Sequence, residues 1–75
     1  MASKKYENFI TNVKRRRQEL KLTQKEAGKI IGVTASAYAR KERGERPFFT
    51  VEAMLICNEL GITIDQATKE GQNNG

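Results

Sequence analysis

Apolar side chains recur every three or four residues along most of this chain, which is the pattern of helices with one buried face. No strand is needed to account for these apolar positions. The pattern therefore predicts an all-α fold, a compact bundle of about five helices in one domain over residues 6–70. Residues 1–5 and 71–75 are expected to be flexible tails. The expected helices cover residues 6–20, 23–32, 34–43, 50–60 and 65–70.

The stretch from Thr23 to Gly44 has the pattern of two short helices joined by a tight turn. Thr23 and Thr34 precede the two apolar stretches, where their hydroxyls can accept from free backbone N–H groups. Gly32 and Gly44 follow those stretches, at positions where a positive φ is usual. Two helices joined by a short turn containing Gly form the helix-turn-helix unit. This unit is the centre of the predicted fold.

Gly28 lies in the middle of the first of these two helices. Glycine there costs about 1 kcal/mol relative to alanine. A close approach of another backbone would explain its presence, and we expect the second helix to cross at this point. The alternative is an ordinary helical hairpin that has a small residue at its contact.

The remaining apolar positions predict the core. Cys57 is expected to be a small buried hydrophobe, and Thr50 is expected to cap the fourth helix. The expected core residues are Phe9, Ile10, Val13, Leu20, Leu22, Ala27, Ile30, Ile31, Val33, Ala37, Tyr38, Ala53, Met54, Ile56, Cys57 and Leu60.

Arg17 is expected to point inward from the first helix, because it lies four residues after Val13 and so continues the three-to-four-residue spacing of Ile10 and Val13. A buried guanidinium needs a carboxylate. Glu42 lies four residues after Tyr38 and so shares its inward face. We therefore predict an Arg17–Glu42 ion pair between the first and third helices. The alternative is that both are ordinary surface charges.

Composition excludes several kinds of chemistry. The 75 residues include one cysteine and no histidine, which removes Cys/His zinc sites, histidine-based triads and most acid–base chemistry near neutral pH. We therefore expect no enzyme activity, no metal and no cofactor. No signal peptide and no apolar run near 18 residues is visible, so we expect a cytoplasmic protein.

Charge is distributed unevenly along the chain. Residues 1–46 carry 13 Lys and Arg against 5 Asp and Glu, a net charge of +8. Residues 47–75 carry 1 against 4, a net charge of −3, which together give the formal +5. A basic half that contains the two-helix unit indicates a polyanionic partner. Nucleic acid is favoured over a membrane, because the apolar faces are needed for the core.

The sequence resembles the XRE-type helix-turn-helix family of phage repressor and Cro-like regulators. The resemblance runs from Ile10 to about Asp65, which is nearly the whole domain. It rests on Arg17, on LTQKEAGKIIGVT at 22–34, on AYARKERG at 37–44 and on LGITID at 60–65. It implies a lambda repressor-like DNA-binding domain whose third helix lies in the major groove. An arginine–glutamate pair also recurs in this family.

The resemblance implies a role for individual residues toward double-stranded DNA. Arg40 is expected to read a guanine. Gln24 is expected at the start of the second helix, where free N–H groups favour phosphate, and the matching glutamine in the family bridges the DNA backbone and the recognition helix. For Lys14, Arg15 and Arg16, phosphate contact and simple solvation both remain open. The base-reading candidates are Ala35, Ser36, Ala39 and Arg40. The phosphate candidates are Thr23, Gln24, Lys25, Thr34, Arg43 and Arg46.

Three positions depart from the family pattern. Lys41 replaces an apolar residue, and its ammonium is expected to reach solvent. Tyr38 replaces an aliphatic core residue and needs a partner for its hydroxyl. Residues 66–68, Gln-Ala-Thr, replace bulky apolar residues in a helix that often contributes to the dimer contact in relatives. We therefore expect a weak or DNA-assisted homodimer, or a contact made by Phe48 and Phe49; those two could equally be one core residue and one loop anchor.

Together these features predict a sequence-specific DNA-binding transcriptional regulator that occupies a pseudo-palindromic operator. A repressor of phage or mobile-element type is the form that the family implies, with no small-molecule ligand. The alternative is a protein-interaction module, an antitoxin or anti-repressor, on the same fold.

Overall fold

A computed structural model describes residues 3–70, and all regular structure in this range is helical, so the predicted all-α bundle is confirmed. Of the predicted tails at 1–5 and 71–75, residues 1–2 and 71–75 lie outside the described residues, whereas Lys4 and Lys5 belong to the first helix. The helices are α1 (Lys4–Glu19), α2 (Gln24–Ile31), α3 (Ala35–Glu42), α4 (Thr50–Leu60) and α5 (Ile64–Thr68).

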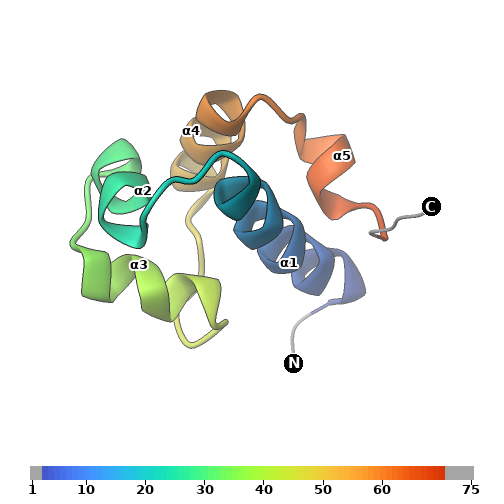
Figure 1. The fold of residues 1–75 in the computed structure, drawn as a ribbon. Helices are drawn as coiled ribbons and strands as arrows, with labels where there is room; N and C mark the ends of the chain where they lie inside the picture. The colour runs from blue at the N-terminus through green and yellow to red at the C-terminus, as the bar shows by residue number, and fades with distance from the viewer. Residues whose placement is uncertain (1–2, 71–75) are drawn as a thin grey trace.

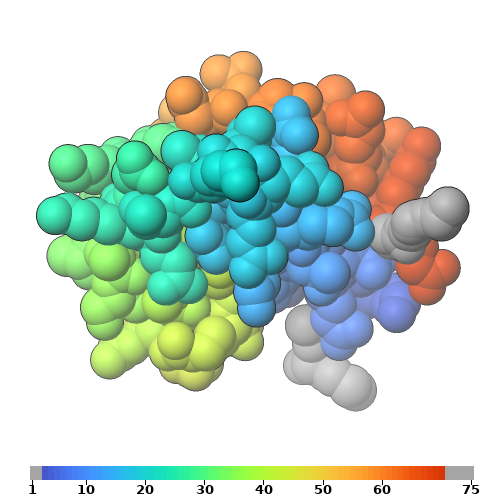
Figure 2. All heavy atoms as spheres, viewed as in Figure 1, coloured from blue at the N-terminus to red at the C-terminus, as the bar shows by residue number. Residues whose placement is uncertain are grey.

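The helix-turn-helix and the last helix lie at opposite ends of the molecule. α2 and α3 pack against each other at one end, α5 lies at the other, and α1 lies between them and ends beside α2 (Figure 1). The space-filling view shows the same division, with the green α2–α3 end opposite the red α5 end (Figure 2). None of the helices within residues 3–70 is long and apolar enough to cross a bilayer.

The start and end of α1 differ from the prediction. Ser3 caps the helix by accepting from the Tyr6 N–H at 3.1 Å, so the helix begins at Lys4 and not at Tyr6. Leu20, an expected core residue, is exposed. The reason is that Leu20 is the C-cap of α1, and Lys21 then takes a φ of 60° that turns the chain toward α2.

The core joins all five helices, and an aromatic cluster lies within it. Phe48 makes edge contacts with Phe9 and Tyr38, at centroid distances of 5.3 and 5.9 Å. The Phe48 N–H donates to the Tyr6 hydroxyl at 2.8 Å. Phe48 is therefore a core residue, whereas Phe49 is exposed. The buried apolar residues are Phe9, Val13, Ala27, Ile31, Tyr38, Phe48, Ile56, Cys57, Leu60 and Ala67.

Two predictions for α4 were wrong. Thr50 is the first helical residue and not the cap; the cap is Phe49, whose N–H donates to the Glu52 carboxylate at 2.9 Å. Met54 is exposed, although the spacing predicts it in the core. Ile56 and Cys57 with Leu60 already form the buried side of α4, and Met54 lies outside that side.

α5 is held by asparagine side chains that the sequence analysis did not identify. The Asn12 Nδ2 donates to the carbonyls of Ala67 and Lys69 at 2.7 and 2.8 Å, and the Asn8 Nδ2 donates to the Thr68 carbonyl at 3.1 Å. These carbonyls lie at the end of a helix, where intrahelical donors are missing. Polar contacts from α1 thus hold this helix in a chain that lacks bulky apolar residues at 66–68.

Gly28 lies where a backbone approaches closely, as the sequence predicts. A Cβ added there would lie 2.7 Å from the Val33 carbonyl oxygen and 3.1 Å from that of Thr34. The neighbouring backbone is the turn that leads into α3 and not the middle of α3. The Gly28 carbonyl in turn accepts from the Val33 N–H at 2.8 Å.

We predict that Gly28→Ala destabilises the fold, although alanine is the better helix former. The added methyl meets backbone atoms that can move only with α3, and overpacking of this kind costs about 1–3 kcal/mol. Urea or thermal unfolding measures the effect, with Lys29→Ala as an exposed neighbouring control. A stability of Gly28→Ala equal to or above that of the parent would contradict the close contact.

Candidate nucleic-acid interface

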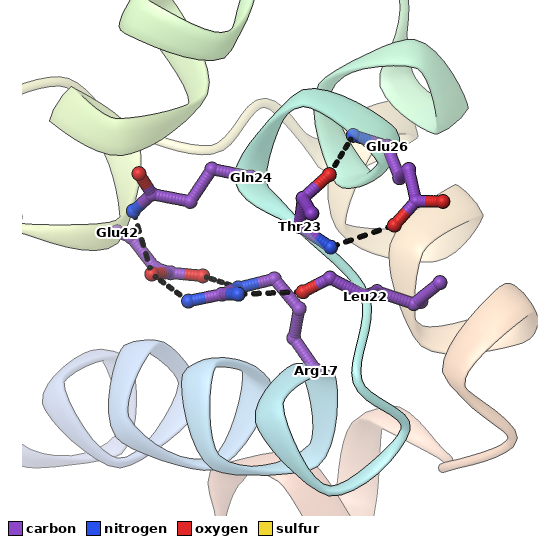
Figure 3. A network of polar contacts seen from close by, with 6 residues as sticks. All are labelled: Arg17, Leu22, Thr23, Gln24, Glu26 and Glu42. Carbon is purple, nitrogen blue, oxygen red and sulfur yellow. Dashed lines mark hydrogen bonds and ion pairs between the residues drawn. The ribbon is translucent and has the colours of Figure 1, made fainter.

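The start of α2 is fixed by a reciprocal cap. The Thr23 hydroxyl accepts from the Glu26 N–H at 3.0 Å, and the Thr23 N–H donates to the Glu26 carboxylate at 2.8 Å (Figure 3). The hydrogen bond from the Thr23 backbone lowers the pKa of the Glu26 carboxylate most, and the interaction with the Thr23 side chain lowers it further. Gly32 ends α2 with a φ of 81°, as expected.

The four base-reading candidates lie on one outer side of α3. The Thr34 hydroxyl caps this helix by accepting from the Ala37 N–H at 3.1 Å. Ala35 and Ala39 lie one turn apart, as do Ser36 and Arg40, so all four share a side of the helix. Ser36 and Arg40 are exposed, and the two alanines are half-buried.

The phosphate candidates lie at the starts of α2 and α3 and in the chain that follows α3. Three of them lie at the start of α2, Thr34 lies at the start of α3, and Arg43 and Arg46 follow α3. The chain after α3 folds back on the helix, because the N–H groups of Glu45 and Arg46 donate to the Arg40 carbonyl at 2.9 and 3.4 Å. All six are exposed except Gln24, which is half-buried.

Arg17 and Glu42 form the buried ion pair that the periodicity predicts. Arg17 Nε donates to Glu42 Oε2 at 2.7 Å, and Arg17 Nη2 donates to Glu42 Oε1 at 3.0 Å. The remaining guanidinium nitrogen, Nη1, donates to the Leu22 carbonyl at 2.7 Å. The Gln24 amide donates to Glu42 at 3.2 Å, so the carboxylate connects α1, α2 and α3 (Figure 3). The side chains of Arg17 and Glu42 are only 10% and 2% exposed.

The pKa values of this pair reflect the contact. Burial alone would raise the pKa of Glu42, but the hydrogen bonds from Arg17 and Gln24 outweigh it and hold the pKa below its ordinary value. The hydrogen bond to Glu42 raises the pKa of Arg17. Both groups therefore stay charged at neutral pH.

Tyr38 lies beside this pair with its hydroxyl buried. The side chain is fully buried, and the hydroxyl has no hydrogen-bond partner within residues 3–70. Burial, followed by the nearby Glu42 charge, raises the pKa of the hydroxyl. The charged groups of Glu42 and Arg17 lie beside the hydroxyl, but neither meets it in the geometry of a regular hydrogen bond.

Lys41 does not reach solvent, contrary to the prediction. Its ammonium is buried and lies 2.8 Å from the Glu52 carboxylate, 2.9 Å from the Pro47 carbonyl and 4.6 Å from the centre of the Phe49 ring. The burial follows from its position, three residues after Tyr38 on the inward face of α3. An acidic residue in the first turn of the next helix was the signal that could have identified this contact.

Of the three undecided cations of α1, Arg16 contacts another helix and Arg15 contacts a side chain of α1 itself. The Arg16 Nε donates to the Leu60 carbonyl at 2.9 Å, at the end of α4, and Arg16 also pairs with Glu19. Arg15 donates to the Asn12 side chain at 2.8 Å, which links it to the residue that holds α5. Lys14 is exposed.

A model described as helix-turn-helix matches residues 13–66, which include Arg17, Glu42 and all of α2, α3 and α4. The chain belongs to the XRE-type helix-turn-helix family. It is therefore a DNA-binding regulator of this type, in a family that is typically non-enzymatic. Comparison with curated proteins and with solved structures gave no match.

We predict that Glu42→Ala destabilises the protein by about 3–5 kcal/mol, because Arg17 is left buried without its carboxylate. Glu45→Ala is the matched control. Glu45 is paired with Arg43 at the same 2.7 Å distance, but both of those side chains are more than half exposed. The midpoint of unfolding of Glu45→Ala should therefore equal that of the parent. Equal midpoints for the two variants would show that burial does not strengthen the Arg17–Glu42 pair.

The same pair should contribute to acid sensitivity. The folded pKa of Glu42 lies below its ordinary value of 4.5, so its stabilisation is complete above that pH and is lost as pH falls through the folded pKa. Stability of Glu42→Ala should therefore depend less on pH in this acidic range than that of the parent.

We predict that Tyr38→Phe raises the free energy of unfolding by about 1 kcal/mol. The change removes a buried hydroxyl without a partner and keeps the aromatic contact with Phe48. Thermal unfolding of the variant measures the effect. A lower melting temperature would show that the hydroxyl forms a stabilising hydrogen bond with its charged neighbours.

Proposed function

We propose that this protein is a sequence-specific transcriptional regulator, a repressor of phage or mobile-element type, that places α3 in the major groove of a pseudo-palindromic operator. The observation that supports this most is the outer side of α3. Ser36 and Arg40 are exposed there, while the opposite side is held by Tyr38 and Glu42 in the core. Side chains of that kind in the first turns of a recognition helix can reach base edges.

The base-reading chemistry would centre on Arg40. An arginine can donate two hydrogen bonds to the major-groove edge of guanine, a contact worth about 1–3 kcal/mol of discrimination. Ser36 can donate or accept and therefore discriminates weakly, and Ala35 can lie against a thymine methyl. With one strong reader, much of the specificity would come from DNA shape.

The phosphate contacts would come from the residues around α3. Gln24 lies at the start of α2, where free N–H groups and the helix dipole favour an anion. Thr23, Lys25 and Thr34 would contact the backbone near the helix starts, and Arg43 and Arg46 would contact it beyond α3. The net charge of +8 over residues 1–46 supports this arrangement.

We further propose a weak or DNA-assisted homodimer with half-sites roughly 34 Å apart. Phe48 is in the core and cannot contribute to a self-contact. Exposed apolar side chains elsewhere support one: Phe49 before α4, Val51, Met54 and Leu55 on α4, and Ile64 at the start of α5. An operator with two-fold symmetry requires two copies, so a second copy is the occupant that this function demands.

The second candidate function is a protein-interaction module, an antitoxin or anti-repressor. The same exposed apolar side chains on α4 and α5 favour it, together with the small residues on the outer side of α3. A gel shift over a range of salt concentrations separates the two functions. DNA binding predicts an affinity that falls with log[salt] at a slope of about −0.9 per neutralised phosphate.

Selection of bound sequences from random DNA is the direct test of operator recognition. We expect a symmetric consensus, because each copy would read one half-site. An absence of any enriched sequence, or of any shift at low salt, would contradict the proposed function.

We predict that Arg40→Ala relaxes the base preference, at a loss of about 1–3 kcal/mol on the selected operator only. Arg43→Ala should weaken binding evenly on all sequences and reduce the salt slope by about one phosphate. Titration of both variants on the selected and on scrambled DNA measures this difference. If both change affinity alike on every sequence, the base-reading role of Arg40 is wrong.

A further inference from the structure

A carboxylate lies among the cations that follow the recognition helix. Glu45 accepts two hydrogen bonds from Arg43, at 2.7 Å from Nε and 3.2 Å from a terminal nitrogen. The two side chains are 56% and 55% exposed, so solvent and any large partner can reach both. The backbone N–H of Glu45 donates to the Arg40 carbonyl at 2.9 Å, which places Glu45 beside the end of α3.

Glu45 acts on two cations to which the proposed function gives a role. The hydrogen bonds from Arg43, and the charges of Arg43 and Arg40, lower the pKa of Glu45, so it is ionised at neutral pH. The pairing with Glu45 likewise raises the pKa of Arg43. A guanidinium that is already paired in this two-bond geometry must give up that partner before it can bind a phosphate in the same way.

We propose that Glu45 limits the affinity of this protein for DNA by competing with backbone phosphate for Arg43. The proposal rests on the proposed function, because it requires DNA to approach the end of α3. The competition is independent of base sequence, since phosphates carry no sequence information. Glu45 therefore keeps binding to random DNA weak, and the contacts made by the outer side of α3 determine where the protein stays.

The test is Glu45→Gln, which keeps the size of the side chain and removes its charge. We expect binding to random-sequence DNA to tighten about two- to fivefold at low salt, the range of an exposed ion pair. The salt slope should steepen by a fraction of about 0.9, the value for one whole phosphate, because Glu45 only partly displaces phosphate from Arg43 in the parent. The selected operator should show the same fold-change, because the effect is independent of sequence.

Glu19→Gln is the matched control. Glu19 is also an exposed glutamate paired with an arginine, at 3.3 Å from Arg16, and its loss changes the net charge by the same amount. Arg16 contacts the end of α4, so this pair lies away from the end of α3. The affinity gain of Glu19→Gln should be smaller, since it reports only the change in overall charge.

A double-mutant cycle assigns the effect to Arg43. In an Arg43→Gln background, Glu45→Gln should change affinity no more than the Glu19 control does. Equal effects of Glu45→Gln and Glu19→Gln in the parent, with DNA binding intact, would overturn this inference alone. A gain that persists in the Arg43→Gln background would overturn the competition for Arg43. A parent protein that binds no DNA at low salt would overturn the proposed function and this inference with it.

Discussion

The structure depends most on the buried contact between Arg17 and Glu42. Arg17 uses all of its nitrogens, two toward the Glu42 carboxylate and one toward the Leu22 carbonyl, so the bend between α1 and α2 and the end of α3 are held by one side chain. Buried charges tolerate few arrangements, because an ion that loses its partner in the interior is strongly unfavourable. The orientation of α3 relative to α1 is therefore defined more narrowly than apolar packing alone would define it.

Lys41 and Glu42 form ion pairs that connect the end of α3 to two different helices. Glu42 contacts Arg17 on α1, and Lys41 contacts Glu52 at the start of α4. Both pairs involve side chains that are nearly inaccessible to solvent. The last turn of α3 is consequently fixed on both sides, whereas its first turn is held mainly by the Thr34 cap and by the close approach to Gly28. This arrangement fixes one end of the helix and leaves its outer side accessible.

Sequence patterns predicted the features that depend on local spacing. The caps at Thr23 and Thr34, the left-handed Gly32 and the Arg17–Glu42 pair follow from periodicity and from the chemistry of helix ends. Contacts between distant segments were missed where the residue type gave no signal. An asparagine on α1 that holds α5 resembles any polar helix residue in sequence, and a lysine on an inward face was assumed to reach solvent. Which apolar side of α4 is buried depends on neighbouring helices, so Met54 was placed on the wrong side. The DNA contacts proposed for α3 stay predictions.

The accessible side of α3 has a consequence for how binding preference can change. Ser36 and Arg40 are exposed and make no contribution to the apolar core, so substitutions there need not disturb the ion pairs at the other end of the helix. If the proposed base contacts hold, stability and recognition rest on different residues of the same eight-residue helix. A chain of this kind can acquire a new target by exchanging a few surface side chains, while its folding requirements stay the same. Divergence of recognition within a shared scaffold needs no compensating change in the interior.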